Sequence, residues 1–382
     1  MIIKEVKARA ILDSRKQKTI EVSVNGCVAS SPSGKSTGKY ETPCYFKSLE
    51  NNIKLINNSK LLIGLEINSF SDLKKIEALI KKKFRFNDAK KFGANALYAW
   101  ESAILKALAK SEGKELWQII NPDAKVMPIP VGNAIGGGLH SHNEGHPIFQ
   151  EFLLIPKEVS IQKNVAIMND IYNRLKVITE SKSVDDEGAL QVGLHDEQVL
   201  HIMAHYKDKV NIGIDCASST IFEGGFYRYN KLLFSNNMQI KYINQLIDTF
   251  DIFYIEDPID EEDFLGFERI NRKHLLVGDD LTVTHKDRLK KAIKNKSINA
   301  MIIKPNQNGS LVELAEIFKI CKKNRIKTIL SHRAGETMDS ALADYAFAFE
   351  ADYIKCGIKT KWREAKLNRL IEIEKSFKHT LF

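Results

Sequence analysis

The sequence predicts an α/β protein in which a β/α barrel of the TIM type follows a smaller N-terminal α+β domain. Its length of 382 residues suits one large barrel with an attached domain. In the second half of the chain, six short apolar runs each end on a charged or polar residue, at intervals of 23 to 41 residues. Prolines and glycines gather ahead of these runs, in NPDAKVMPIPVGNAIGGG. We therefore expect a domain boundary there, with the small domain in residues 1–124 and the barrel in residues 125–382.

The expected N-terminal domain opens with strands and continues with helices. The segment TIEVSVNGCVAS alternates apolar and polar residues around Asn25-Gly26, a two-residue turn signal, and so predicts an antiparallel strand pair. Between residues 69 and 121, apolar residues recur every three or four positions, which is typical of amphipathic helices.

A glycine-rich segment, SPSGKSTGKYE at residues 31–41, resembles a nucleotide-binding loop, because Gly34-Lys35-Ser36 reads as the end of such a motif. The first glycine of such a loop would stand at Ala29, and no helix start follows Lys35 and Ser36. The backbone cradle for phosphates is therefore missing. We expect a mobile loop that touches phosphate or metal in another way.

Composition limits the classes of function. No apolar run approaches the roughly 18 to 20 residues of a membrane span, and the N-terminus lacks a signal-peptide core, so we expect a cytoplasmic protein without a membrane partner. The five scattered cysteines form no C-x-x-C pair and are expected to be core thiols. The net charge of +9 lies on lysine-rich helical faces without interleaved aromatics, so no nucleic-acid partner is expected.

The six apolar runs are typical of parallel strands that are buried on both faces. Such a strand has no favourable place for a charge, and in a closed barrel all strand carboxyl ends meet at one face. We interpret the terminal residues as one constellation at that face: Asp215, Glu256, Asp279, Lys304, His332 and Lys355. A structural role is also open for neighbouring acids, since Asp257 and Asp280 could be helix N-caps, Asp257 with Pro258 in the first turn.

This constellation has the groups needed to remove a proton next to a carboxylate. Asp215, Glu256 and Asp279 offer the oxygen ligands that suit Mg²⁺. Lys304 and Lys355 would stand beside them, and a lysine near a divalent metal and another cation has a lowered pKa, which makes it usable as a base. The metal would stabilise the resulting enolate.

Two further acids, Glu151 and Glu187, fit a reaction that expels a β-hydroxyl group. Such a reaction needs a protonated carboxylic acid opposite the base, and Glu151 and Glu187 could share one proton. Taken alone, Glu151 could equally be a surface acid at a strand end. Arg333 has the planar, forked donor geometry that binds phosphate or carboxylate.

These residues lie in segments that resemble the enolase family along nearly the whole chain. The matching segments are ILDSR, PSGKSTGKYE, GANAL, GNAIGGG, QEFLLIP, DDEGA, IGIDCASS, IEDP, VGDDLTVT, IKPNQNGS, SHRAGET and KLNRLIEIE. The resemblance implies an enolase-type β/α barrel with a capping domain, and Mg²⁺-dependent dehydration of 2-phosphoglycerate to phosphoenolpyruvate with two Mg²⁺ per active site. A lysine base beside Mg²⁺ is the known arrangement of that superfamily. A small phosphorylated acid as substrate and a homodimer or higher homo-oligomer are also implied.

The same resemblance implies a role for each site residue. Lys304 would take the C2 proton, Glu187 assisted by Glu151 would help the C3 hydroxyl leave, and His140 would close over the substrate. The substrate would be bound by Lys355, His332, Arg333, Ser36 and Gln150. The first metal would be held by Asp215, Glu256 and Asp279, and the second by Ser36 of the mobile loop.

Departures from the family pattern leave alternatives open. Ala334 occupies the position at which the family has a serine that would contact the phosphate. The mobile loop contains an additional lysine, Lys35, which could compensate for the missing serine or hinder binding of the second metal. In GGGLHSHNEGH, either His140 or His142 could be the loop histidine, and together with His146 they could bind a transition metal. The alternatives are an enolase-like enzyme for an acid without a phosphate, and a weakly active or inactive binding protein.

Overall fold

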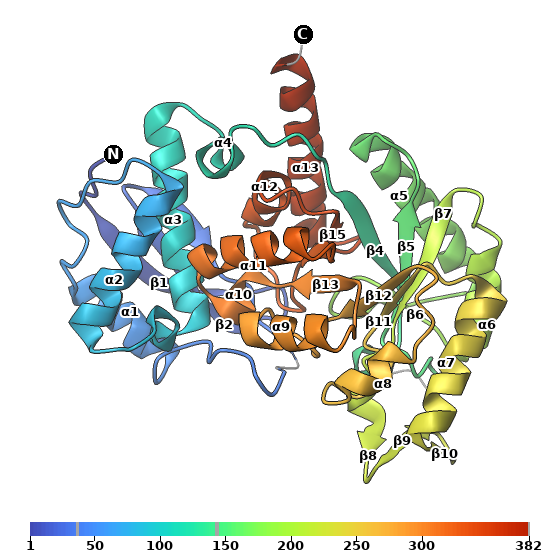
Figure 1. Cartoon of the computed structure of the whole chain (residues 1–382). Helices are drawn as coiled ribbons and strands as arrows, with labels where there is room; N and C mark the ends of the chain where they lie inside the picture. Colours follow the sequence, from blue (N-terminus) through green and yellow to red (C-terminus); the bar gives the residue numbers. More distant parts are fainter. Residues whose placement is uncertain (36–37, 142–144, 381–382) are drawn as a thin grey trace.

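The computed structural model describes residues 1–35, 38–141 and 145–380 and consists of a small N-terminal part beside a larger barrel (Figure 1). Strands β1 (Val6–Leu12), β2 (Lys18–Val24) and β3 (Cys27–Ser30) form an antiparallel sheet in that order. Asn25 and Gly26 join β2 to β3 and both have positive φ, as the turn signal predicts. The predicted strand pair is therefore confirmed, with a third strand added.

Helices follow this sheet in the chain, as the three- to four-residue apolar period predicts. The longest of them, α3 (Ala94–Glu112), packs on β2 and β3 and ends at Gly113 in the left-handed conformation. The others are α1 (Leu49–Asn58), η1 (Phe70–Asp72), α2 (Leu73–Phe84), η2 (Ala89–Phe92) and α4 (Leu116–Ile120).

Eight strands close into a barrel, because the last strand pairs with the first. The strands in chain order are β4 (Ile129–Gly136), β5 (Glu151–Pro156), β7 (Val210–Asp215), β11 (Tyr254–Glu256), β12 (Leu275–Gly278), β13 (Ala300–Ile303), β14 (Lys327–Ser331) and β15 (Tyr353–Lys355). The six runs predicted as parallel strands are β7 and β11 to β15, and each pairs in parallel with its neighbours among them. The predicted barrel is confirmed.

One barrel strand runs against the others, which the sequence analysis did not predict. Strand β5 is antiparallel to both β4 and β7. Its first residue therefore lies at the same barrel face as the last residues of the other strands. A short strand, β6 (Leu190–Gln191), extends the sheet beside β4.

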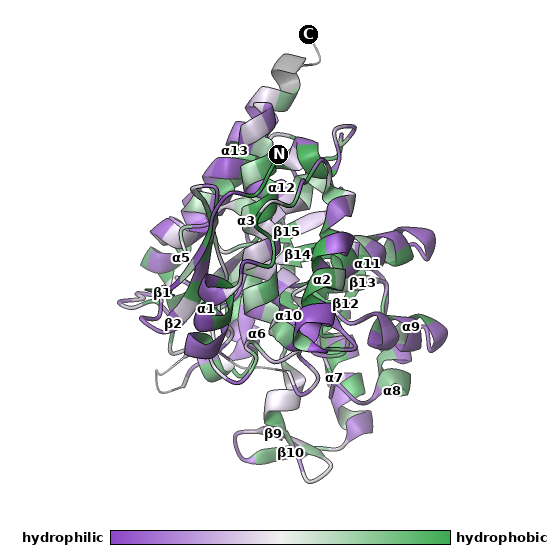
Figure 2. Ribbon diagram, turned by 90° about the vertical axis from the view of Figure 1, so that its left-hand side faces the viewer, coloured by the Kyte–Doolittle hydropathy of each residue, from purple (hydrophilic) through white to green (hydrophobic). Residues whose placement is uncertain are grey.

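Helices surround the barrel, and Figure 2 shows both hydrophobic and hydrophilic residues along them. They are α5 (Ile161–Ile178), α6 (Asp196–Ala204), α7 (Asn236–Phe250), α8 (Phe264–Glu268), α9 (Lys286–Lys294), α10 (Pro305–Asn308), α11 (Leu311–Lys323), α12 (Ala341–Ala348) and α13 (Lys361–Thr380). Short 3-10 turns η3 (Gly138–His140) and η4 (Ser218–Ile221) and the hairpin strands β8 (Phe222–Glu223), β9 (Phe226–Tyr229) and β10 (Leu232–Phe234) complete the fold.

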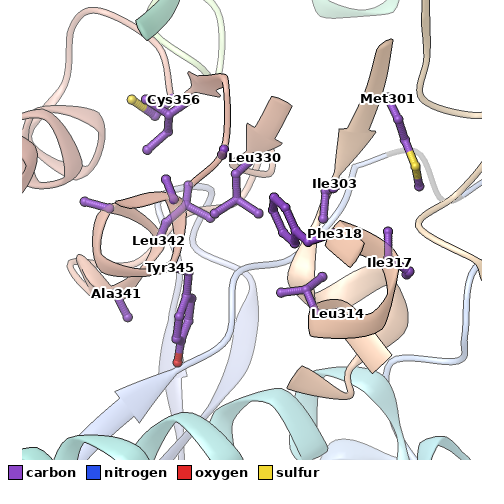
Figure 3. Close-up of a cluster of buried hydrophobic side chains, with 14 of the residues drawn as sticks. Met301, Ile303, Leu314, Ile317, Phe318, Leu330, Ala341, Leu342, Tyr345 and Cys356 are labelled. Atoms are coloured by element: carbon purple, nitrogen blue, oxygen red, sulfur yellow. The ribbon is translucent and has the colours of Figure 1, made fainter. Parts of the chain in front are cut away.

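Two apolar cores hold the barrel. One fills its interior and is made of Val131, Leu153, Ile155, Tyr254, Val277, Ala300, Ile302, Ile329 and Tyr353. The other lies between the strands and the helices and continues into the N-terminal domain, so the two domains share apolar burial. Figure 3 shows the part of it around β13, β14, α11 and α12. The Tyr345 hydroxyl points toward α3 in Figure 3 and donates to Ser102 Oγ at 2.7 Å in this interface.

The suggested helix caps were wrong. Helix α8 begins at Phe264 with Asp263 as its N-cap, and Asp280 lies in a turn. The buried Asp257 carboxylate instead accepts the backbone N–H groups of Asp279 and Asp280 at 3.1 and 2.7 Å. It therefore ties the end of β11 to the end of β12.

The five cysteines that the sequence predicts as core thiols differ in burial. All five cysteines are free; Cys216, Cys321 and Cys356 are buried, whereas Cys27 and Cys44 are half-buried. No helix in the described part of the chain is both long and apolar enough to span a membrane.

Candidate active site

The charged ends of the barrel strands meet in one small polar cavity, of about 50 Å³. Its lining includes most of the predicted site residues: His140, Gln150, Glu151, Glu187, Asp215, Asp279, Lys304, His332, Arg333 and Lys355. Glu256 is fully buried beneath this lining. Ser36 and His142 lie outside the described residues.

Strand register places the acids side by side. Asp215 at the end of β7 is paired with Glu256 of β11 on one side and with Glu151 of the antiparallel β5 on the other. Glu151 is 3 % exposed, so it is a buried acid of the cavity and the surface alternative is wrong. Three carboxylates thus come from three neighbouring strands.

Lys355 supplies the positive charge for these three acids. Its Nζ lies 2.9 Å from Glu151 Oε2, 3.2 Å from Asp215 Oδ2 and 2.9 Å from Glu256 Oε2. Burial alone would lower the pKa of Lys355, but Glu151, Glu256 and Asp215 together raise it well above its ordinary value. The Tyr254 hydroxyl also donates to Glu256 from inside the barrel.

Lys304 and Asp279 form a second ion pair in the cavity. Burial favours the neutral amine, yet the charges of Asp279 and Asp280 outweigh it and raise the pKa of Lys304 above its ordinary value. The sequence predicts a lowered pKa for a lysine beside a bound metal. The protein groups alone do not lower the pKa of Lys304; they raise it. The other Asp279 oxygen, Oδ1, is buried and has no hydrogen-bond partner among the residues that the structure describes.

These carboxylates offer the oxygen ligands that a hard divalent cation prefers. Asp215, Glu256 and Asp279 end adjacent strands, offer only oxygen atoms, and include the orphaned Asp279 Oδ1. In the structure, the ammonium groups of Lys304 and Lys355 compensate the negative charge of these carboxylates. In the described part of the chain, the one group of three histidine, cysteine or acid side chains with ligand atoms all within 4.8 Å of one another is His140, Glu151 and Glu187.

Glu187 is held by His332 on the other side of the cavity. His332 Nε2 lies 3.2 Å from Glu187 Oε2, and both side chains are buried. Burial, helped by Arg363, lowers the pKa of His332 to about 4, so the imidazole is neutral at neutral pH. Burial would raise the pKa of Glu187, but His332 lowers it below its ordinary value.

The two candidate acids therefore differ in protonation. Burial raises the pKa of Glu151 to about 8 despite Lys355, because Glu187 and Asp215 add negative charge nearby. Glu151 thus holds its proton up to a higher pH than Glu187 does, which is how a pair of carboxyl groups divides acid and base roles. His140 Nδ1 lies 4.0 Å from Glu151 Oε1, beside both acids.

Comparison with known proteins identifies the family. Residues 3–120 match the family model of the enolase N-terminal domain, and residues 124–381 match that of the enolase C-terminal TIM barrel domain. The chain belongs to the enolase family. It is 35 % identical to an enolase of Archaeoglobus fulgidus, 34 % to one of Sulfurisphaera tokodaii and 34 % to one of Ehrlichia ruminantium, over 98 % of this chain and at least 96 % of each relative. The resemblance and the enzyme class, phosphopyruvate hydratase, a lyase, are thereby confirmed.

Arg333 lies in the cavity as the enolase resemblance predicts, but it already has an anionic partner. Its Nη2 lies 3.0 Å from both carboxylate oxygens of Glu41, and Nη1 donates to Asn306 Oδ1 at 3.3 Å. Glu41 also accepts the backbone N–H of Gly38, so it links the N-terminal loop to the barrel. Glu41 ends the motif PSGKSTGKYE in the sequence, but nothing in that motif indicates its pairing with Arg333.

The residue that replaces the family's serine, Ala334, is buried at the cavity wall. Its backbone carbonyl and that of Arg333 each accept a 2.9 Å hydrogen bond from the guanidinium of Arg363, a fully buried residue of α13. Lys366, one turn further on, donates to the carbonyl of Thr337. In the sequence, Arg363 and Lys366 lie three residues apart and close to the apolar residues Leu367 and Leu370. This spacing was the available signal that the two cations are buried, and it was missed.

Lys35 joins three active-site loops of this enolase-family chain. Its Nζ lies 3.3 Å from the carbonyl oxygen of Leu139 and 3.3 Å from Asp186 Oδ2. Of the described histidines of the second loop, His146 donates from Nδ1 to the carbonyl oxygen of its own neighbour Pro147 and is not part of the cluster around Glu151. Among the second-loop histidines that the structure describes, His140 is the one that lies beside the acids.

Proposed function

We propose that this chain dehydrates 2-phosphoglycerate to phosphoenolpyruvate. The observation that carries the proposal is the meeting of Lys304, Lys355, Arg333 and the paired acids Glu151 and Glu187 in one buried cavity. The reaction breaks the C2–H and C3–O bonds of the substrate, forms a C2=C3 double bond and releases water. Each of these changes has a group of suitable chemistry in the cavity.

Lys304 is the proposed base for the C2 proton. It projects from the end of β13, and its backbone N–H donates a 2.9 Å hydrogen bond to Thr284 Oγ1, which fixes the backbone at this position. A base held in this way has little freedom to lose when the substrate binds, which favours a reactive geometry.

Glu187 and Glu151 are the proposed acid pair for the C3 hydroxyl. Because Glu151 retains its proton at neutral pH, it is the store from which a proton reaches the leaving oxygen by way of Glu187. The two acids and His140 bring their polar atoms within 4.8 Å of one another, which suits such a relay. His140 would close this side of the substrate.

Asp215, Glu256 and Asp279 are the proposed ligands of the first of two Mg²⁺, and Ser36 is the proposed ligand of the second. A bound Mg²⁺ would stabilise the negative charge that develops on the substrate carboxylate. The Asp279 Oδ1 atom without a partner supports this assignment.

The substrate carboxylate would pair with Lys355 and its phosphate with Arg333, with His332 and Gln150 completing the contacts. Arg333 is buried, and its Nη2 lies 3.0 Å from both carboxylate oxygens of Glu41, which supports its pairing with an anion. Lys35 lines the same cavity and adds a positive charge that the family pattern lacks.

The proposal is tested by turnover of 2-phosphoglycerate, followed as absorbance of the enol phosphate product. Purified protein is assayed over a range of Mg²⁺ concentrations, with Asp279→Asn as the site variant and Asp287→Asn, an exposed position on α9, as the matched control. We expect activity that chelation abolishes and a Mg²⁺ requirement raised about tenfold or more in Asp279→Asn alone.

No turnover by the folded, magnesium-loaded protein would overturn the proposal. It would favour an acid without a phosphate as substrate, an alternative supported by Ala334 and by the Glu41 partner of Arg333, or a binding role. The cytoplasmic location and the homodimer or higher homo-oligomer implied by the enolase resemblance also remain proposals.

A further inference from the structure

A cavity of about 650 Å³ lies at the end of the barrel opposite the candidate active site. Its lining includes Lys327, the first residue of β14, and Asp352 and Val126, which precede β15 and β4. The site residues described above lie at the other ends of these strands. Nothing in the proposed dehydration uses this cavity.

Aromatic rings form its floor. Phe318 of α11 stacks on Phe349 with ring centroids 5.0 Å apart and planes 17° apart, and Phe70 meets Phe349 edge-on at 6.0 Å. Figure 3 shows Phe318 among Ile303, Leu314 and other core residues, so the floor is anchored from below. A preformed apolar surface of this kind loses little freedom when a ligand binds.

Cations form its rim. The lining holds four basic and two acidic side chains: Lys319, Lys322, Arg325, Lys327, Glu350 and Asp352. Lys327 pairs with Asp352 at 2.7 Å and Lys322 with Glu350 at 3.3 Å. The other two cations, Lys319 and Arg325, have no carboxylate within ion-pair distance among the described residues, so the rim carries an uncompensated positive charge beside an apolar floor.

We propose that this cavity binds a small organic anion whose body is an aromatic ring or a short hydrocarbon and whose single acidic group meets Lys319 and Arg325. The volume lies in the range of about 300 to 1,000 Å³ typical of small-molecule sites. Charge complementarity selects an anion, and the aromatic floor selects an apolar body. The lining joins Phe70 and Ile120 of the N-terminal domain to α11 of the barrel, so the ligand stabilises the packing of the two domains.

The test uses 8-anilinonaphthalene-1-sulfonate, an anionic aromatic dye, and its uncharged relative N-phenyl-1-naphthylamine. Both are titrated by fluorescence against the full chain, with 2-phosphoglycerate and Mg²⁺ in excess so that the candidate active site is excluded. The site variant is Lys319→Glu/Arg325→Glu. The control is Lys163→Glu/Lys176→Glu, the same charge change on α5, which does not line this cavity.

We expect saturable binding of one anionic dye per chain, weakened about tenfold or more by the site variant and less than about twofold by the control. The uncharged dye should bind both variants alike, and Ala315→Trp, which fills the cavity, should weaken both dyes. Dye should also raise the unfolding temperature of the wild type and of the control only.

Absence of saturable dye binding, or equal weakening by the two charge variants, would overturn the proposal. So would a change of sedimentation mass in the site variant with unchanged dye binding, because that result would mean that a second copy of the chain covers this face. Turnover of 2-phosphoglycerate is measured on the same preparations, so failure here is separable from failure of the proposed function.

Discussion

Lys355 lies within 3.2 Å of three carboxylates, and the charge balance of the candidate site depends on it. Removing one member of a buried ion pair leaves the others uncompensated, typically at a loss of about 3 to 5 kcal/mol. Single residues at this site therefore act on both stability and chemistry. Substitutions that keep charge and change one hydrogen bond are the clearest probes.

Ala334→Ser restores the one hydroxyl that the family pattern has and this chain lacks. A hydrogen bond to a charged group contributes about 1.5 to 3 kcal/mol, so we expect the Kd for inorganic phosphate or for substrate to fall by about tenfold. Calorimetric titration measures it, and Ala334→Cys is the control of similar size with a weak donor. Equal affinities for all three proteins would show that Ala334 does not face the phosphate.

At the scale of elements, the N-terminal loop and the loop after β14 are docked by backbone pairing. Ser33 and Gly335 exchange two hydrogen bonds, of 2.7 and 2.9 Å. A Cβ atom at Gly335 would lie 2.2 Å from both Asp13 Oδ2 and Ser33 Oγ, closer than any real contact. The close approach of Asp13 and Ser33 thus requires a glycine at position 335. The backbone pairing holds the loop that contains Lys35 against the barrel face at which the candidate active site lies.

Gly335→Ala should therefore separate these loops. We expect kcat/KM for 2-phosphoglycerate to fall about ten- to a hundredfold, because small displacements of positioning groups have effects of that size, while the far-ultraviolet circular dichroism stays unchanged. Gly225→Ala, in the remote β8–β9 turn with open space around its Cβ, is the control and should keep its activity. Equal losses in both would assign the effect to general destabilisation.

Much of the element pattern could be predicted from the sequence. A run such as IFYIED shows both the buried strand and its charged end, because burial on two faces leaves polar residues only at the terminus. The direction of β5 could not be predicted from FQEFLLIP, because apolar content does not distinguish a parallel from an antiparallel strand. Glu151 lies at the barrel face of the candidate site because β5 is antiparallel, so this position could not be predicted either. Glu41 and Arg363 were missed because their partners lie about 290 and 30 residues away in the sequence.

At the scale of the whole molecule, buried acids make stability depend on pH. Burial, together with the charge of Glu187, raises the pKa of Asp185 to about 7 from an ordinary value of 3.8. Its Oδ1 accepts the N–H groups of Glu187 and Ala189, whereas Oδ2 is buried without a hydrogen-bond partner in the described part of the chain. A raised pKa means that the folded state holds the proton more tightly, so stability from this group is full below pH 3.8 and is lost as the pH rises through about 7.

Asp185→Asn should remove this pH dependence, because the amide oxygen keeps both hydrogen bonds and no charge forms. At pH 8 we expect the variant to be more stable than the wild type by about 1 to 3 kcal/mol, and the difference should shrink toward pH 5. Urea unfolding at both pH values measures it, with the exposed Asp208→Asn as control. A stability difference that is the same at pH 5 and pH 8 would contradict this account of Asp185.

The central claim, that Lys304 removes the C2 proton and the Glu187 side of the cavity expels the C3 hydroxyl, is tested most directly by nuclear magnetic resonance of 2-phosphoglycerate in D₂O with Mg²⁺. We predict that the wild type forms phosphoenolpyruvate and places deuterium at C2 of the remaining substrate. Lys304→Ala should do neither, whereas Glu187→Gln should still exchange the C2 proton while forming product at least about a hundredfold more slowly. Undiminished C2 exchange by folded Lys304→Ala would contradict the account.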